Sequence, residues 1–254
     1  RSKYYKKYRN SRNVIYIDFS QIPKDCRNYH QYIERIQDGL VEDLASLYLE
    51  FSIRRSHSAW DVLTEIFEKT NHRFIFVIDE WDAVFHMSFV TEEDQKAYLL
   101  FLKALLKDKA YVKFTYMTGV LPIAKYSSGS ELNMFVEYDM TVMERFSHCF
   151  GFVEEEVDRL FRIYLATTKR PKITRKELEV WYDGYHTAAG ERLYNPRSVV
   201  CALANNQLAN YWTSSGPYDE IFFYVKNNID DIRDDLVLMI AGEGVEAKIR
   251  NYAA

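Results

Sequence analysis

The chain has 254 residues, of which 48% are hydrophobic and 16% aromatic, enough to bury the core of one large domain or of a core with a smaller lobe. Its formal net charge is −4, from 33 Lys and Arg against 37 Asp and Glu, so the chain as a whole does not attract nucleic acid. No stretch approaches the roughly 18 uninterrupted apolar residues of a membrane span, and no signal-peptide pattern opens the chain. Three widely spaced cysteines argue against a disulfide framework and against a Cys-ligated metal site. We therefore predict a soluble, cytoplasmic protein without a membrane partner.

The first twelve residues, RSKYYKKYRNSR, contain no acid and interleave basic side chains with tyrosines. Such a segment can bind nucleic acid through phosphate contacts and base stacking. The alternative is a solvated helix face whose tyrosines pack inward. We favour this second interpretation and keep nucleic acid as an alternative partner.

Strands and amphipathic helices alternate over residues 1–150. Short β-rich runs at 14–19, 74–79 and 111–118 predict strands, and a weaker run covers 135–141. Apolar residues three and four apart predict helices over 29–51, over 58–67 after Ser58, and over 91–106 after the N-cap Thr91. This order predicts an α/β fold in which a parallel sheet carries helices on both faces.

Beyond Gly151 helical segments follow one another without an obvious strand, so we place a second, mostly helical lobe at residues 151–254. Helices are predicted at 153–165, from the capping box of Thr174 to about Gly184, and after the N-cap Asn195 with Pro196. Two more are predicted around 221–225 and 232–240.

Two adjacent carboxylates, Asp79 and Glu80, stand where the apolar run at 74–78 ends. A strand buried on both faces reads as such a run, and ligands gather at the carboxyl ends of parallel strands. This is the layout of a Walker B motif, in which the first carboxylate orders Mg²⁺ and the second polarises the water that attacks the γ-phosphate. The alternative is that both residues simply end the strand and begin a loop. Convergence of Asp18, Asp79 and Thr118 on one cleft would favour the motif.

Four segments together resemble the AAA-ATPase-like family, a group of P-loop-type ATPase modules often fused to a C-terminal PD-(D/E)xK nuclease-like domain. They are VIYIDFS at 14–20, FVIDEWD at 76–82, MTGVLPIAKY at 117–126 with LNMF at 132–135, and WYDGY at 181–185 with YNPRS at 194–198. The resemblance implies a P-loop NTPase/AAA-like core in residues 1–150, followed by a helical lid. It also implies ATP and Mg²⁺ as cofactors, with a nuclease-like domain or other effector as partner.

The resemblance also implies roles for single residues of the core. Asp79 takes the Mg²⁺-ordering position and Glu80 that of the catalytic base, while Asp82 is a third acid assigned with Asp79 to the metal. Thr118 falls where a sensor of the γ-phosphate lies, although it can instead merely cap its strand. Asn133 matches a recurrent family position on the cofactor side, or it holds its loop through backbone hydrogen bonds.

In the second lobe, the turn Asn195-Pro196-Arg197 resembles the start of the lid helix. A helix N-terminus that faces the cleft would favour phosphate or other polar groups of the nucleotide. Arg197 would then serve as a sensor or finger, and the alternative is a solvated side chain.

No Gly-Lys-Ser/Thr triplet occurs in the chain, so it has no phosphate-binding loop of the P-loop kind. In the family that loop precedes the strand at 14–19, so we expect a fragment that begins downstream of it, with a degenerate relative as the alternative. The predicted function is an ATP-binding and ATP-hydrolysing module that regulates a nuclease-like effector, provided that a P-loop is supplied. The alternative is a non-hydrolysing scaffold that binds protein or nucleic acid. A metal-dependent nuclease site built from the three acids at 79, 80 and 82 is a weaker third reading.

Overall fold

The computed structural model describes residues 4–23, 25–51, 53, 57–123, 131–140, 143–187 and 189–211, with the single positions 234, 237, 238 and 241. The chain divides into two compact units, Arg1–Val136 and Glu137–Tyr252. Among the described residues, none of the helices combines the length and the apolar character that a bilayer crossing needs.

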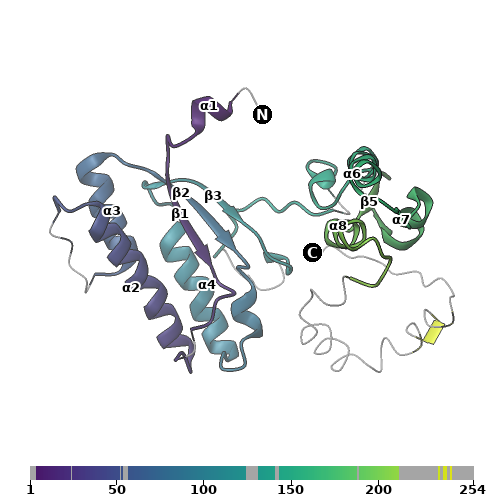
Figure 1. Ribbon diagram of the computed structural model, residues 1–254. Helices are drawn as coiled ribbons and strands as arrows, with labels where there is room; N and C mark the ends of the chain where they lie inside the picture. Colours follow the sequence, from purple (N-terminus) through teal and green to yellow (C-terminus); the bar gives the residue numbers. More distant parts are fainter. Residues whose placement is uncertain are drawn as a thin grey trace. The chain divides into compact units, whose positions relative to one another are not determined.

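The first unit contains a three-stranded parallel sheet in the order β1-β2-β3 (Figure 1). Its strands are β1 (Asn13–Asp18), β2 (Phe74–Asp79) and β3 (Val112–Met117), and they confirm the three predicted β-rich runs. β1 and β2 pair in register, so Asp18 lies beside Asp79. A register shift between β2 and β3 skips Lys113 near the start of β3.

The helices of this unit are α1 (Tyr5–Tyr8), α2 (Tyr29–Leu47), α3 (Ala59–Thr70), the 3₁₀ turn η1 (Ala83–His86) and α4 (Glu92–Leu106). Thr91 caps α4 as predicted, because its hydroxyl accepts from the amide of Asp94 while the Asp94 carboxylate accepts from the amide of Thr91. α2 ends before the predicted position 51, since Leu47 is exposed and continues no apolar stripe.

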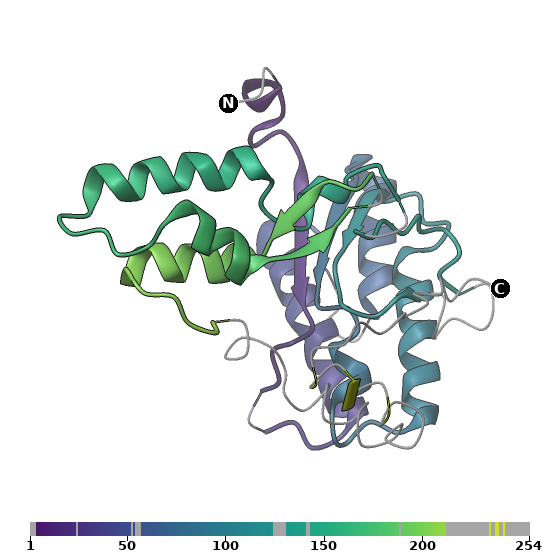
Figure 2. The same ribbon diagram turned by 90° about the vertical axis from the view of Figure 1, so that its right-hand side faces the viewer.

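Helices α2, α3 and α4 pack against one face of the sheet (Figures 1 and 2). The buried core between them includes Ile15, Ile17, Phe76, Leu63 and Leu102. Alternate strand residues point to the other face, where Val14, Tyr16, Phe114 and Tyr116 are 56–60% exposed, with Ile75 and Val77 partly buried between them. We call these six residues the open sheet face.

The sequence predicted helices on both faces of the sheet. Within the described part of the first unit, helices cover one face only. Likewise, β2 alternates between buried and partly buried residues rather than being buried on both sides. The expected strand over 135–141 is absent at residues 135–140, where the chain is irregular and Phe135 packs against the core, and Thr141 lies outside the described residues.

The second unit contains the three predicted helices, α6 (Glu154–Thr167), α7 (Arg175–Tyr182) and α8 (Pro196–Asn205), and a 3₁₀ turn η2 (Ser147–Cys149). It also contains a strand pair that was not predicted, β4 (Asp183–His186) antiparallel to β5 (Arg192–Tyr194). α7 therefore ends two residues before Gly184, where β4 takes over. The helices predicted at 221–225 and 232–240 lie outside the described residues apart from positions 234, 237 and 238.

Candidate functional site

Polar side chains meet at the carboxyl ends of the three parallel strands. Asp18 ends β1, Asp79 ends β2 and Thr118 directly follows β3. The Thr118 hydroxyl donates a hydrogen bond to Asp79 Oδ1, and the strand register places Asp18 next to Asp79. The structure thus brings together the three residues whose convergence the sequence led us to expect.

Tyr16 is a further partner of Asp79 that sequence reasoning did not single out. Its hydroxyl donates to Asp79 Oδ2 over 3.2 Å. Desolvation of the phenol, followed by the hydrogen bond to Asp79, raises the pKa of Tyr16, although most of the ring surface is exposed. Tyr16 is therefore a protonated donor at neutral pH, and together with Thr118 it fixes both oxygens of the Asp79 carboxylate.

Asp18 is held by the turn that follows β1. Its Oδ1 accepts from the hydroxyl and the amide of Ser20 over 2.7 and 2.9 Å, and its Oδ2 accepts from the Gln21 side chain over 3.1 Å. The hydrogen bond from the Ser20 hydroxyl is the main cause that lowers the pKa of Asp18. Two carboxylates on strands about 4.8 Å apart create a negative edge that favours a cation.

Glu80 lies in a strained turn immediately after Asp79. Its φ of 51° is in the left-handed region, which costs a residue other than glycine on the order of 1–3 kcal/mol. The turn is held on both sides, because the Ala83 amide donates to the Glu80 carbonyl over 3.0 Å and the Trp81 amide donates to the Thr118 carbonyl over 3.0 Å. The side chain of Glu80 is exposed and follows Asp79 at the carboxyl end of β2. Strain of this kind is found at functional sites when the surrounding structure enforces it.

Asp82 is used differently from the two acids before it. It is only 2% exposed, and its Oδ2 accepts from the amides of Val120 and Leu121 over 2.9 and 2.6 Å. Gly119 makes this approach possible, since a Cβ there would lie 2.5 Å from Asp82 Oδ1 and 2.4 Å from Trp81 Cδ1. The described contacts of Asp82 are those of an anchor for the loop after Thr118, and none of them supports the predicted metal role.

The other predicted cofactor residues lie away from this edge or in the second unit. Asn133 Oδ1 accepts from Lys107 Nζ over 2.7 Å, just beyond α4 and therefore toward the end of the sheet where β3 begins. In the second unit Asn195 is the N-cap of α8, because its Oδ1 accepts from the Ser198 amide over 2.9 Å, and Pro196 occupies the first turn as predicted. Arg197 is exposed. A nucleotide-binding role for these residues stays a prediction.

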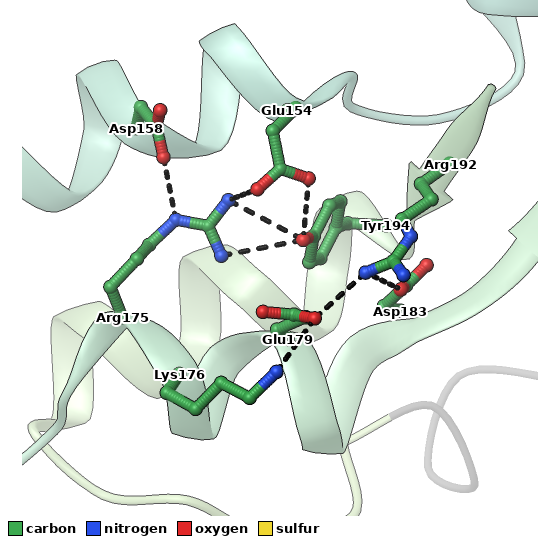
Figure 3. A network of polar contacts seen from close by, with 8 residues as sticks. All are labelled: Glu154, Asp158, Arg175, Lys176, Glu179, Asp183, Arg192 and Tyr194. Carbon is green, nitrogen blue, oxygen red and sulfur yellow. Dashed lines mark hydrogen bonds and ion pairs between the residues drawn. The ribbon is translucent and has the colours of Figure 1, made fainter.

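A dense polar network ties the second unit together (Figure 3). Arg175 at the start of α7 pairs with Asp158 over 2.6 Å and with Glu154, both on α6, while the Tyr194 hydroxyl donates to Glu154 over 2.7 Å. Desolvation, followed by the hydrogen bond to Glu154, raises the pKa of Tyr194 to about 12. A second group in Figure 3 joins Lys176 and Arg192 to Glu179, and Arg192 to Asp183. These contacts fasten α6, α7 and the β4-β5 pair to one another.

The fold and the edge define an α/β protein with a parallel sheet and acidic residues where the strands end. A family profile described as predicted AAA-ATPase matches residues 2–128, half of the chain. The chain therefore belongs to the AAA-ATPase-like family. No curated protein and no solved structure is similar enough to count as a match.

The described residues contain no group of three or more His, Cys, Asp or Glu side chains arranged to hold a metal ion. Mg²⁺ does not need such a group, because it keeps several of its waters and uses one or two carboxylates together with substrate phosphates. Asp79 is half-buried, and hydroxyl groups orient both of its oxygens. Its carboxylate therefore fits a site in which the metal is bound through water.

Proposed function

We propose that this chain forms the part of an ATP-hydrolysing module that orders Mg²⁺ and the attacking water, and that a Gly-Lys-Ser/Thr loop has to be supplied to complete it. The observation that carries the proposal is the meeting of Asp18, Asp79 and Thr118 at one edge of a parallel sheet, directly before Glu80. Ligands of open α/β sheets bind outside the carboxyl ends of the strands. Membership of the AAA-ATPase-like family supports nucleotide use.

Asp79 is the residue proposed to hold Mg²⁺ through bound water. A carboxylate oxygen accepts about two hydrogen bonds, so one lone pair on each oxygen remains after the bonds from Tyr16 and Thr118. These two donors fix the plane of the carboxylate before any ligand arrives, which lowers the cost of ordering it. When bound, Mg-ATP supplies charge neutralisation and the electrophilic γ-phosphorus.

Glu80 is proposed to orient and deprotonate water as a general base. Its exposed carboxylate follows Asp79 by one residue, and the left-handed backbone of Glu80 turns the chain away from the strand direction at this point. Thr118 is proposed as a sensor, because its hydroxyl can exchange the bond to Asp79 for one to a phosphate oxygen. The loop-anchoring carboxylate of Asp82 is assigned a positioning role for Thr118.

The second unit is proposed as the lid of this module, with Asn195, Pro196 and Arg197 at its nucleotide-facing helix start. Regulation of a nuclease-like effector is part of the same proposal, and its support is the resemblance of the four sequence segments given above.

The decisive experiment uses a protein that joins this chain to a Gly-Lys-Ser/Thr loop. Glu80→Gln should bind Mg-ATP within about twofold of the parent protein but lose at least about 100-fold in turnover, the range of general acid–base catalysis. Glu68→Gln, an exposed change on α3, is the matched control and should alter neither. Unchanged turnover in Glu80→Gln would contradict the general-base role of Glu80. Failure of the parent protein to bind Mg-ATP would contradict the proposed function as a whole.

A further inference from the structure

A basic cleft lies at the opposite end of the sheet, where the strands begin. This hollow of about 500 Å³ is lined by Arg12, Arg73 and Lys113, together with Asn13, Asn71 and His72. β2 runs for six residues from this cleft to the Asp79 edge, so the two sites are about 20 Å apart. The cleft is therefore separate from the proposed nucleotide site.

Each strand contributes one cation to the basic cleft. Arg12 precedes β1, Arg73 precedes β2, and Lys113 is the residue that the register shift skips near the start of β3. All three side chains are exposed, and within the described residues no carboxylate lines the cleft or pairs with them. The carbonyl end of α3, which finishes at Thr70, adjoins the cleft because the next residue, Asn71, lines it. A helix C-terminus is equivalent to about −0.5 elementary charge, so the three full positive charges outweigh it.

Exposed tyrosines adjoin the cleft through the segment that contains α1. The guanidinium carbon of Arg12 lies 5.9 Å from the centre of the Tyr8 ring, and the Ser11 hydroxyl donates to the Tyr8 carbonyl over 2.9 Å. Tyr4, Tyr5 and Tyr8 are 40–52% exposed, and no residue of α1 is buried. The expectation that these tyrosines pack inward is wrong. Figure 1 shows α1 at the end of the sheet where β1 begins.

We propose that the basic cleft and the tyrosines of the α1 segment bind single-stranded nucleic acid. The cations at 12, 73 and 113 would contact successive phosphates, and unpaired bases would stack on the exposed rings. Further cations accompany these rings, because Lys7 Nζ lies 5.2 Å from the centre of the Tyr8 ring and the guanidinium carbon of Arg9 lies 5.7 Å from the centre of the Tyr5 ring. A basic groove beside stacking platforms is the arrangement by which proteins bind single strands without sequence preference. The chain as a whole is acidic, so the attraction is local and depends steeply on salt.

The charge test uses the complete 254-residue chain and a fluorescein-labelled twelve-nucleotide oligothymidylate, with binding followed by fluorescence anisotropy between about 50 and about 200 mM salt. The variant Arg12→Gln/Arg73→Gln/Lys113→Gln is compared with Lys96→Gln/Lys169→Gln/Arg170→Gln, which removes the same charge from exposed positions outside the cleft. The cleft variant should bind at least about tenfold more weakly. The slope of log affinity against log salt should become shallower by about 2, since each of the three lost phosphate contacts contributes about 0.7 for a single strand. The control should stay within about twofold of the parent chain.

The base test uses an abasic strand with the same number of phosphates. The parent chain should prefer the oligothymidylate by about fivefold or more, and Tyr8→Ala should remove most of that preference. Equal affinity for the two strands would overturn the stacking assignment, and equal affinity of the cleft and control variants would overturn the site. Binding to vesicles of phosphatidylserine without binding to the oligonucleotide would overturn the proposal in favour of an anionic membrane surface. Lys113→Gln alone, expected to weaken binding about threefold, repeats the charge test with a single exposed change.

Discussion

Replacing Asp82 by alanine separates a structural role of this carboxylate from a role at the metal. The side chain is 2% exposed and accepts two backbone hydrogen bonds, from Val120 over 2.9 Å and from Leu121 over 2.6 Å. Hydrogen bonds to a charged acceptor contribute about 1.5–3 kcal/mol each. Val120 is 69% exposed and its amide can regain water, so the lower end applies, and Asp82→Ala should destabilise the first unit by about 3 kcal/mol. Asp82→Asn keeps an acceptor oxygen in place and should cost about 1 kcal/mol.

The assay is urea unfolding of the chain in EDTA, with and without added Mg²⁺. For a unit of this size the denaturant slope is about 2 kcal/mol per molar urea, so the midpoint for Asp82→Ala should fall by about 1.5 M in EDTA. Hydrogen exchange of the Val120 and Leu121 amides should accelerate in the same variant, because both lose their acceptor. A midpoint unchanged in EDTA, with a loss only of stabilisation by Mg²⁺, would refute the role of Asp82 as a loop anchor and support its predicted role at the metal.

Three further predictions concern stability. Gly119→Ala should destabilise by about 2 kcal/mol in urea unfolding, because its Cβ would lie 2.4 Å from a buried indole carbon, whereas Gly39→Ala in α2 meets nothing within 4 Å and should not destabilise. Arg175→Met removes two ion pairs from a side chain that is 22% exposed and should lower the thermal midpoint of the second unit, while Arg159→Met, at a 66% exposed side chain, should leave it within error. The pKa of Tyr194 is raised from 10.0 to about 12, so the unfolded chain ionises first, and stability that is complete below about pH 10 is lost as the pH approaches about 12. Urea unfolding at about pH 9 and about pH 11 should show a smaller alkaline loss in Tyr194→Phe than in the parent chain, and an equal loss would contradict the assignment.

The α/β order was predictable because short, nearly continuous β-rich runs alternate with segments whose apolar residues recur three and four positions apart. Caps such as Thr91 and Asn195 act through neighbours three residues away, so the sequence also located the helix starts. The cover of the sheet was not predictable, because Val14 and Ile75 are apolar whether a helix lies over them or not. The β4-β5 pair was missed because its strands are short and β5 is fixed by distant partners, including the bridge between Phe152 and Tyr194.

Parts of the site followed from topology alone. Asp18, Asp79 and Thr118 stand at the ends of neighbouring parallel strands, so their proximity could be deduced from strand order. Tyr16 could have been added, since it lies two residues before Asp18 and therefore on the same face of β1. The anchor role of Asp82 could not be foreseen, because it depends on the orientation of two amides 38 and 39 residues further along the chain.

The open sheet face determines how the isolated chain will behave in solution. Val14, Tyr16, Phe114 and Tyr116 present a contiguous apolar surface, and β1 and β3 are the outer strands of the described sheet, so unpaired backbone groups lie beside it. We therefore expect the isolated chain to self-associate reversibly as its concentration rises, with apparent mass increasing in light scattering. This self-association would hinder purification and crystallisation of the chain. Charged substitutions at Val14 or Phe114 should reduce it, and because both side chains are exposed, the buried core should not change.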